Sequence, residues 1–134
     1  MFSRWFSKKA ARLTGSPAVR RLKTYTSQSG YVYEYFYEGR RPFHSGSDSG
    51  AEFVFSISAS RKAWRPVSVL VSDSAVQSWE SAHARALTPT ERYAIAKMSL
   101  FQAFDERSTP ALMKSPIGAR AADIAAILET LDLD

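Results

Sequence analysis

From Arg20 onward the spacing of the apolar residues changes once, near Ser72, and this change limits the fold more than any other feature. Before it, apolar and polar residues alternate with a period of two, as in half-buried strands. The alternation predicts four strands, over residues 20–26, 31–38, 51–59 and 64–72. The two short turns between the first and second and between the third and fourth strands favour antiparallel hairpins, and sequential strands usually lie side by side. We therefore expect a four-stranded antiparallel meander.

After Ser72 the apolar residues recur at helical spacing. Three helices are predicted, over about residues 74–86, from Thr88 to about Arg107 and from Ser115 to about Leu131. The second has the clearest start, because Thr88 is a suitable N-cap and Glu91 completes a capping box. Strands that precede helices, instead of alternating with them, indicate an α+β fold with its three C-terminal helices on one face of the sheet.

Length and composition fit one compact domain. The chain has 134 residues, 45% of them hydrophobic, and no cysteine, so disulfides, thiol nucleophiles and zinc-thiolate sites are excluded. The longest apolar stretches are far shorter than the roughly 20 residues that cross a bilayer. We expect a soluble, cytoplasmic protein.

Basic residues are concentrated at the N-terminus. Residues 1–24 carry a charge of +7 without one acidic residue, whereas the other residues sum to −2. Residues 2–13 predict a short amphipathic helix, so we divide the chain into a basic helical arm, residues 1–16, and an α+β domain, residues 17–134. Such an arm is compatible with docking on protein, with contact to a membrane surface or nucleic acid, and with an organelle-targeting segment.

The arm and the sheet each offer apolar side chains for an interaction. Phe2, Trp5 and Phe6 lie near one stripe of the predicted arm helix. Val32 and Phe36 lie on the otherwise polar face of the predicted sheet. We expect these five residues to engage each other, a protein partner or a second copy of the chain.

Five basic residues are expected to meet at one end of the sheet. In an antiparallel meander the start of the first strand lies beside the end of the second, which brings together Arg20, Arg21, Lys23, Arg40 and Arg41. The first helix should begin at the same end with unpaired backbone amides. This end is a candidate site for phosphate or carboxylate; the alternative is that these side chains are solvated or paired with acids such as Glu38.

Four alternate tyrosines, Tyr31, Tyr33, Tyr35 and Tyr37, resemble a stacking platform at first sight. A platform needs an open face, whereas three helices follow that need a face to cover. We assign the row mainly to the core, with Tyr31 and Tyr37 emerging at its two ends.

Catalytic chemistry has little support in the sequence. His44 lies in a Gly- and Ser-rich segment, residues 44–50, that predicts a flexible loop, and a mobile loop cannot hold a catalytic triad together. His83 is expected to bond to backbone on the inner face of the first helix. No metal-ligand spacing or phosphate-binding glycine motif is present, so no cofactor is expected. The sequence favours a non-catalytic binding or assembly module; a peripheral membrane or nucleic-acid-binding protein and a small enzyme are the alternatives.

Overall fold

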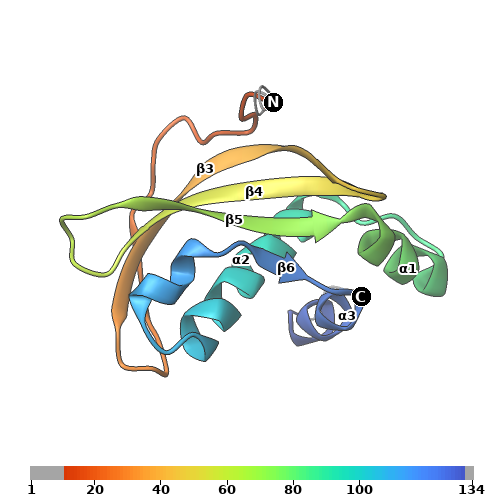
Figure 1. Ribbon diagram of the computed structural model, residues 1–134. Helices are drawn as coiled ribbons and strands as arrows, with labels where there is room; N and C mark the ends of the chain where they lie inside the picture. The colour runs from red at the N-terminus through yellow and green to blue at the C-terminus, as the bar shows by residue number, and fades with distance from the viewer. Residues whose placement is uncertain (1–10, 132–134) are drawn as a thin grey trace.

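The computed structural model describes residues 11–131, and this part of the chain forms a curled sheet with helices on one side (Figure 1). The five strands lie in the order β2-β3-β4-β5-β6. Their bounds are Lys23–Thr26 for β2, Val32–Ser45 for β3, Asp48–Ser58 for β4, Arg65–Ser72 for β5 and Ile117–Ala119 for β6. The helices are α1 (Asp73–His83), α2 (Pro89–Glu106) and α3 (Ala121–Thr130), with a short 3-10 helix, η1, at Pro110–Lys114. The predicted α+β class is confirmed.

The first four strands form the antiparallel meander that the alternating pattern predicts. Tyr35 of β3 lies opposite Lys23 of β2 and Ile57 of β4, while Phe55 of β4 lies opposite Tyr37 of β3 and Val67 of β5. The order and direction of these strands are confirmed, although the first begins at Lys23 and not at residue 20.

The β3–β4 hairpin is longer than predicted, and residues 44–50 are not a flexible loop. Ser45 pairs with Asp48, so that only Gly46 and Ser47 form the turn. Gly46 has a φ of 60°, the left-handed conformation that a tight turn needs. The Gly- and Ser-rich composition therefore belongs to two strand ends and their connection.

A fifth strand, β6, replaces the start of the predicted third helix and makes the sheet mixed. It pairs in parallel with β5, so that Ile117 lies opposite Val69 and Ala119 opposite Val71. Ile117 and Ala119 are buried and the intervening Gly118 is exposed, a period of two that is too short to separate from helical spacing in sequence. The helix predicted from Ser115 begins at Ala121. The prediction of a purely antiparallel, four-stranded sheet was wrong at this edge.

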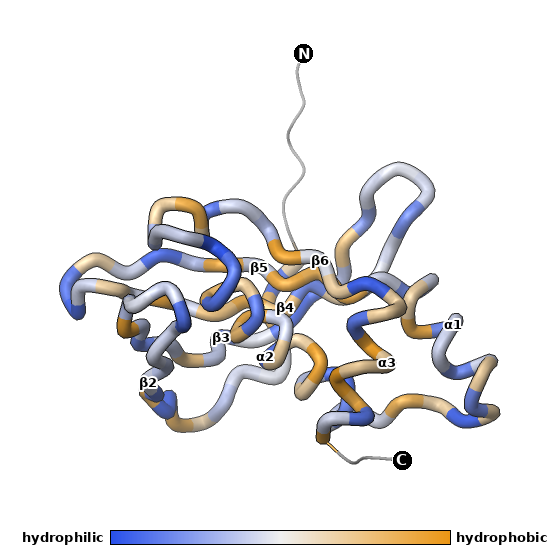
Figure 2. The backbone as a smooth tube through the Cα atoms, turned by 90° about the horizontal axis from the view of Figure 1, so that it is seen from below, coloured by the Kyte–Doolittle hydropathy of each residue, from blue (hydrophilic) through white to orange (hydrophobic). Residues whose placement is uncertain are grey.

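The helices pack together on one side of the sheet. In α2, Ile95, Leu100 and Phe104 are fully buried, and the Phe104 ring stacks on Tyr33 with centroids 4.1 Å apart. Helix α3 packs on α1 and α2 through Ile124, Ile127 and Leu128. Figure 2 shows apolar residues in orange along the helices and the strands. Tyr33 and Tyr35 are buried and Tyr31 is 39% exposed, as the tyrosine row predicts.

The segment before β2 runs beside the sheet and is not helical where it is described. Thr14 forms an isolated antiparallel bridge to Arg40, with two backbone hydrogen bonds of 2.8 Å. The predicted arm helix falls mostly on residues 1–10, which lie outside the described residues, and residues 11–13 carry no helix. The division into an arm and a domain stays a prediction.

The helices of residues 11–131 are too short or too polar to span a membrane.

Candidate anion-binding groove

A groove lies between the buried face of β3 and β4 and the first turns of α2. Two adjoining hollows, of about 500 Å³ and about 250 Å³, share Tyr37 and Tyr93 and make up this feature, which we call the basic groove. Its lining includes the basic residues Arg21, Lys23, Arg40 and Arg92, the aromatic residues Tyr35, Phe36, Tyr37, Phe53 and Tyr93, and Pro17, Ala51, Pro89 and Thr90.

A β-bulge in β3 decides which arginine faces the groove. The pairing with β4 shifts between Tyr37 and Gly39, so that Arg40 lies opposite Phe53 on the buried face and Arg41 lies opposite Glu52 on the outer face. Strict alternation would have given the reverse. Gly39 has a φ of 138°, and a Cβ there would lie 2.9 Å from both the Thr14 carbonyl oxygen and Ser16 Oγ. The bulge and the segment beside it therefore require glycine at this position.

Two tyrosines form the centre of the basic groove. The rings of Tyr37 and Tyr93 meet edge to face, with centroids 4.8 Å apart and planes at 64°. Burial raises the pKa of both phenols, and the Arg40 guanidinium acts against this rise at Tyr37. The Tyr37 hydroxyl is buried and has no partner in hydrogen-bond geometry within residues 11–131. Arg40 thus lies close enough to favour the charged form of this phenol through both hydrogen bonding and charge, although the pair falls short of full hydrogen-bond geometry.

The basic residues of the groove differ in their partners. Arg92 pairs with Glu80, with Nη2 and Oε2 3.5 Å apart. Across the described residues, no acidic side chain lies within ion-pair distance of Arg21, Lys23 or Arg40. Burial and the nearby Lys23 charge lower the pKa of Lys97, one helical turn after Tyr93 on α2. Positive charge is therefore gathered here without a matching negative charge.

Two of the five predicted anion-binding residues are neutralised outside the groove. Arg20 Nη2 lies 3.2 Å from Glu38 Oε1, and its guanidinium lies over the Phe36 ring. Arg41 binds both carboxylate oxygens of Glu52, at 3.0 and 3.2 Å. The five residues therefore do not form one cluster. Arg20 and Arg41 are paired with acidic residues, which is the alternative that the sequence analysis named.

The helix end beside the predicted site is that of α2 and not that of α1. Helix α1 starts next to the β3–β4 hairpin, where Asp73 accepts a hydrogen bond from Ser49 at 2.9 Å and Ser72 caps the first turn. Pro89 and Thr90 at the start of α2 line the groove instead. The longer hairpin carries the end of β5 past Arg40 and so moves α1 away.

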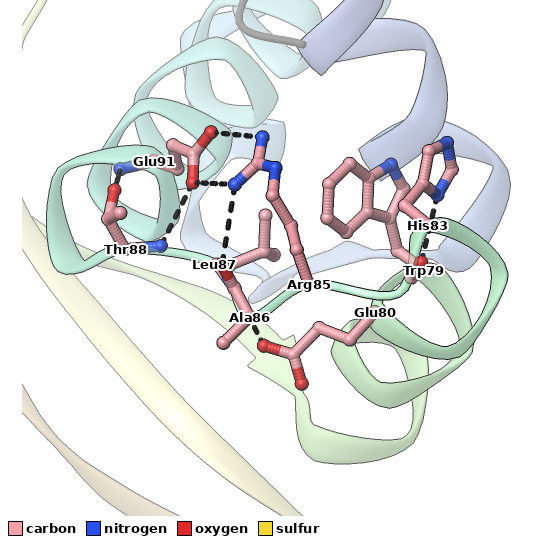
Figure 3. A network of polar contacts seen from close by, with 8 residues as sticks. All are labelled: Trp79, Glu80, His83, Arg85, Ala86, Leu87, Thr88 and Glu91. Atoms are coloured by element: carbon pink, nitrogen blue, oxygen red, sulfur yellow. Dashed lines mark hydrogen bonds and ion pairs between the residues drawn. The ribbon is translucent and has the colours of Figure 1, made fainter.

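A polar network fixes the start of α2 and hence Tyr93 (Figure 3). Arg85 donates to both carboxylate oxygens of Glu91, at 2.9 and 2.8 Å, and Glu91 also accepts the Thr88 backbone amide at 2.9 Å. The hydrogen bonds from Arg85 and Thr88, opposed by burial, lower the Glu91 pKa to about 2. Glu91 is only 7% exposed, so this ion pair holds the α1–α2 connection in one conformation.

Of the apolar interaction candidates, Phe36 lies at the rim of the groove, Val32 lies apart from it, and the other three fall beyond the described residues. Val32 is 46% exposed on the outer face, and Phe36 is half-buried with its ring 5.4 Å from that of Trp64. Phe2, Trp5 and Phe6 fall outside residues 11–131. Their docking on Val32 and Phe36 stays a prediction.

Neither histidine lines the basic groove. His83 Nδ1 lies 2.9 Å from the Trp79 carbonyl oxygen and its ring stacks on Trp79, as expected for a structural histidine. His44 lies in β3 opposite Ser49. Within residues 11–131 no group of His, Cys, Asp and Glu side chains is placed to hold a metal ion.

Tyr93 is a groove residue that the sequence analysis missed, and Lys97 lies one turn after it on α2. Tyr93, Lys97 and Phe101 recur every four residues and so share one stripe of α2. This stripe faces the tyrosine row of β3, since Tyr35 meets Phe101 and Tyr37 meets Tyr93. The spacing of these three residues in the sequence could therefore have indicated that Tyr93 faces the tyrosine row.

Comparisons with protein-family models, curated proteins and solved structures found no significant match to this chain.

Proposed function

We propose that this protein is a non-catalytic binding module that takes up an anionic ligand, a phosphate or carboxylate group, in the basic groove. One observation carries the proposal: Arg21, Lys23 and Arg40 surround a pair of tyrosines with no acidic partner among the described residues. Arg20 and Arg41, close in sequence, each have a carboxylate partner. The contrast supports an anion from outside the chain as the missing partner.

The chemistry of the groove suits such a ligand. Hydrogen bonds from guanidinium and ammonium groups to phosphate or carboxylate are about twice as strong as neutral ones. The unpartnered Tyr37 hydroxyl supplies one more donor, and the Tyr37 and Tyr93 rings offer apolar area to the body of the ligand. A bound anion would also offset the mutual repulsion of Lys23 and Lys97.

Titration calorimetry with three anions tests this proposal. Pyrophosphate, a ten-residue polyglutamate and a ten-nucleotide oligothymidylate present phosphate alone, carboxylates alone and phosphates with bases. We expect at least one to bind, and the triple variant Arg21→Gln, Lys23→Gln, Arg40→Gln to bind it at least tenfold more weakly. The matched control, Arg61→Gln, Lys62→Gln, Lys114→Gln, removes the same charge elsewhere. Equal losses in the two variants would attribute binding to net charge and contradict the proposal.

A second candidate function, protein assembly, is favoured by the outer face of the sheet. Val32 and Trp64 are exposed and Phe36 lies against Trp64, and we call these three side chains the outer apolar cluster. We propose this outer apolar cluster as a contact for a second copy of the chain or another protein. Light scattering on purified protein tests it, with Val32→Lys expected to reduce self-association.

Thr24→Lys is a matched control for the assembly proposal. Thr24 lies opposite Glu34, on the same outer face as Val32 but outside the cluster. A monomeric protein whose mass does not depend on concentration would contradict self-association through this cluster.

A further inference from the structure

A second hollow lies at the opposite end of the tyrosine row. It has a volume of about 530 Å³ and lies between the β4–β5 hairpin, at the left of Figure 1, the start of β3 and Pro110 of η1. We call it the hairpin hollow. Its size falls within the range of sites for small organic ligands. None of its lining residues also lines the basic groove.

Tyr33, one of the residues that line the hairpin hollow, has a buried hydroxyl without a partner. Tyr33 is 0% exposed, with its ring stacked on Phe104, and within residues 11–131 no group hydrogen-bonds to its hydroxyl. Burying a hydroxyl without a partner is unfavourable, and phenylalanine would fill the same core space without that cost. The Arg65 charge, which lines the same hollow, acts on the Tyr33 phenol. Tyr33 and Arg65 thus line the same hollow, and the phenol lies within reach of the Arg65 charge.

The walls combine exposed aromatic rings with one cation. Tyr31 is 39% exposed and Trp64 is 40% exposed, unusual values for large aromatic side chains that line a concave surface. Trp64 is backed by Phe36 on one side. No acidic residue lines the hollow, and none of the described acidic side chains pairs with Arg65. Ser58 holds the wall in place by accepting the Ser60 and Arg61 backbone amides.

We propose that the hairpin hollow binds a small planar aromatic ligand that carries one anionic group, a carboxylate or a phosphate. The ring of the ligand stacks against Trp64 and Tyr31. The anionic group accepts hydrogen bonds from the Arg65 guanidinium and from the Tyr33 hydroxyl. Charge favours an anion, because Arg65 is the only charged residue of the lining.

Direct binding measurements with four probes test the ligand class. Indole-3-acetate and adenosine monophosphate each combine a planar ring with an anionic group, one a carboxylate and the other a phosphate. Adenosine has the ring without the charge, and inorganic phosphate has the charge without the ring. We expect at least one of the two aromatic anions to bind more tightly than both single-feature probes, and its identity separates carboxylate from phosphate ligands. Equal or absent binding of all four at millimolar concentration overturns the proposal.

Three variants test the site itself. Tyr33→Phe and Arg65→Gln should each weaken the bound aromatic anion about tenfold or more, because each removes a hydrogen bond to a charged group. Lys62→Gln, which removes the same charge from the same hairpin but not from the hollow, should change affinity less than twofold.

Thermal unfolding of Tyr33→Phe separates binding from folding. The proposal expects an unchanged or raised melting temperature for this variant, together with the loss of affinity. A lowered melting temperature with unchanged affinity would mean that the hydroxyl serves the fold, through water, and would overturn the assignment. These outcomes do not depend on the basic groove, whose lining the variants leave intact.

Discussion

Replacing Glu91 by glutamine should destabilise the protein near neutral pH and have little effect in strong acid. The change keeps an acceptor for the Thr88 backbone amide and removes the charge that Arg85 binds at 2.8 and 2.9 Å. The Glu91 pKa lies at about 2 in the folded protein against an ordinary value of 4.5. At about 1.4 kcal/mol per pKa unit, this difference corresponds to about 3 kcal/mol. The Arg85 side chain is 37% exposed, so solvent screens the pair, and we expect about 2 kcal/mol.

The sign of the pH dependence follows from the lowered pKa. A carboxyl group that binds protons more weakly in the folded state stabilises the fold above its unfolded pKa. The contribution of Glu91 is therefore complete above about pH 4.5 and is lost progressively as pH falls towards 2. The free-energy difference between the natural chain and Glu91→Gln should shrink over the same interval.

Urea unfolding followed by circular dichroism, at several pH values between 2.5 and 7, measures this difference. Glu129→Gln is a suitable control, because Glu129 is an exposed acid on α3 with no ion pair to any described residue. It should change the free energy of unfolding by less than about 0.5 kcal/mol at any pH. A Glu91→Gln effect that does not vary with pH would refute the assignment of its stabilisation to charge.

Three further predictions concern the tyrosines, the bulge and the N-terminus. Burial and the hydrogen bond to Asp105 raise the Tyr25 pKa from 10.0 to about 12. The contribution of Tyr25 to stability is therefore complete below pH 10 and is lost as pH rises towards 12. Ultraviolet titration should show one tyrosine that ionises at higher pH than an ordinary tyrosine, and Tyr25→Phe should remove that ionisation step. Gly39→Ala should lower the free energy of unfolding, measured in urea, by about 1–3 kcal/mol. The control Gly30→Ala should lower it less, because both glycines have positive φ but only at Gly39 would a Cβ meet neighbouring atoms. Deleting residues 1–10 keeps the Thr14–Arg40 bridge, so the melting temperature should stay nearly unchanged. Association of the protein through the arm should be lost in this variant. Association equal to that of the full chain would contradict a role for the arm.

The meander and the burial of the tyrosine row were predictable because alternation extends over many residues in the first strands. Tyr33 and Tyr35 are buried, Tyr31 is 39% exposed and Tyr37 lines the basic groove. Strand β6 was not predictable, since Ile117 and Ala119 alone cannot distinguish a period of two from a helical one. Residues 117–119 form a strand because they pair in parallel with the free edge of β5.

The candidate site was predictable in part. Hairpin topology brought Arg21 and Lys23 to the same end of the sheet as Arg40, as expected. The bulge at Gly39, which decides the faces of Arg40 and Arg41, depends on packing against Thr14 and Ser16, which are distant in sequence, so alternation alone could not predict those faces. The acidic partners of Arg20 and Arg41 are set by the same strand register, so the sequence alone could not show which basic residues are paired.

Backbone amide mapping by NMR, with pyrophosphate titrated into nitrogen-15-labelled protein, tests the central claim most directly. Anion binding in the basic groove predicts that the largest shift changes fall on Arg21, Lys23, Arg40 and Tyr93, with saturation at one equivalent. Those changes should disappear in the Arg21→Gln, Lys23→Gln, Arg40→Gln variant. Shift changes spread over all basic segments without saturation, or centred on Arg61 and Lys62, would contradict the assignment of the groove as the anion site.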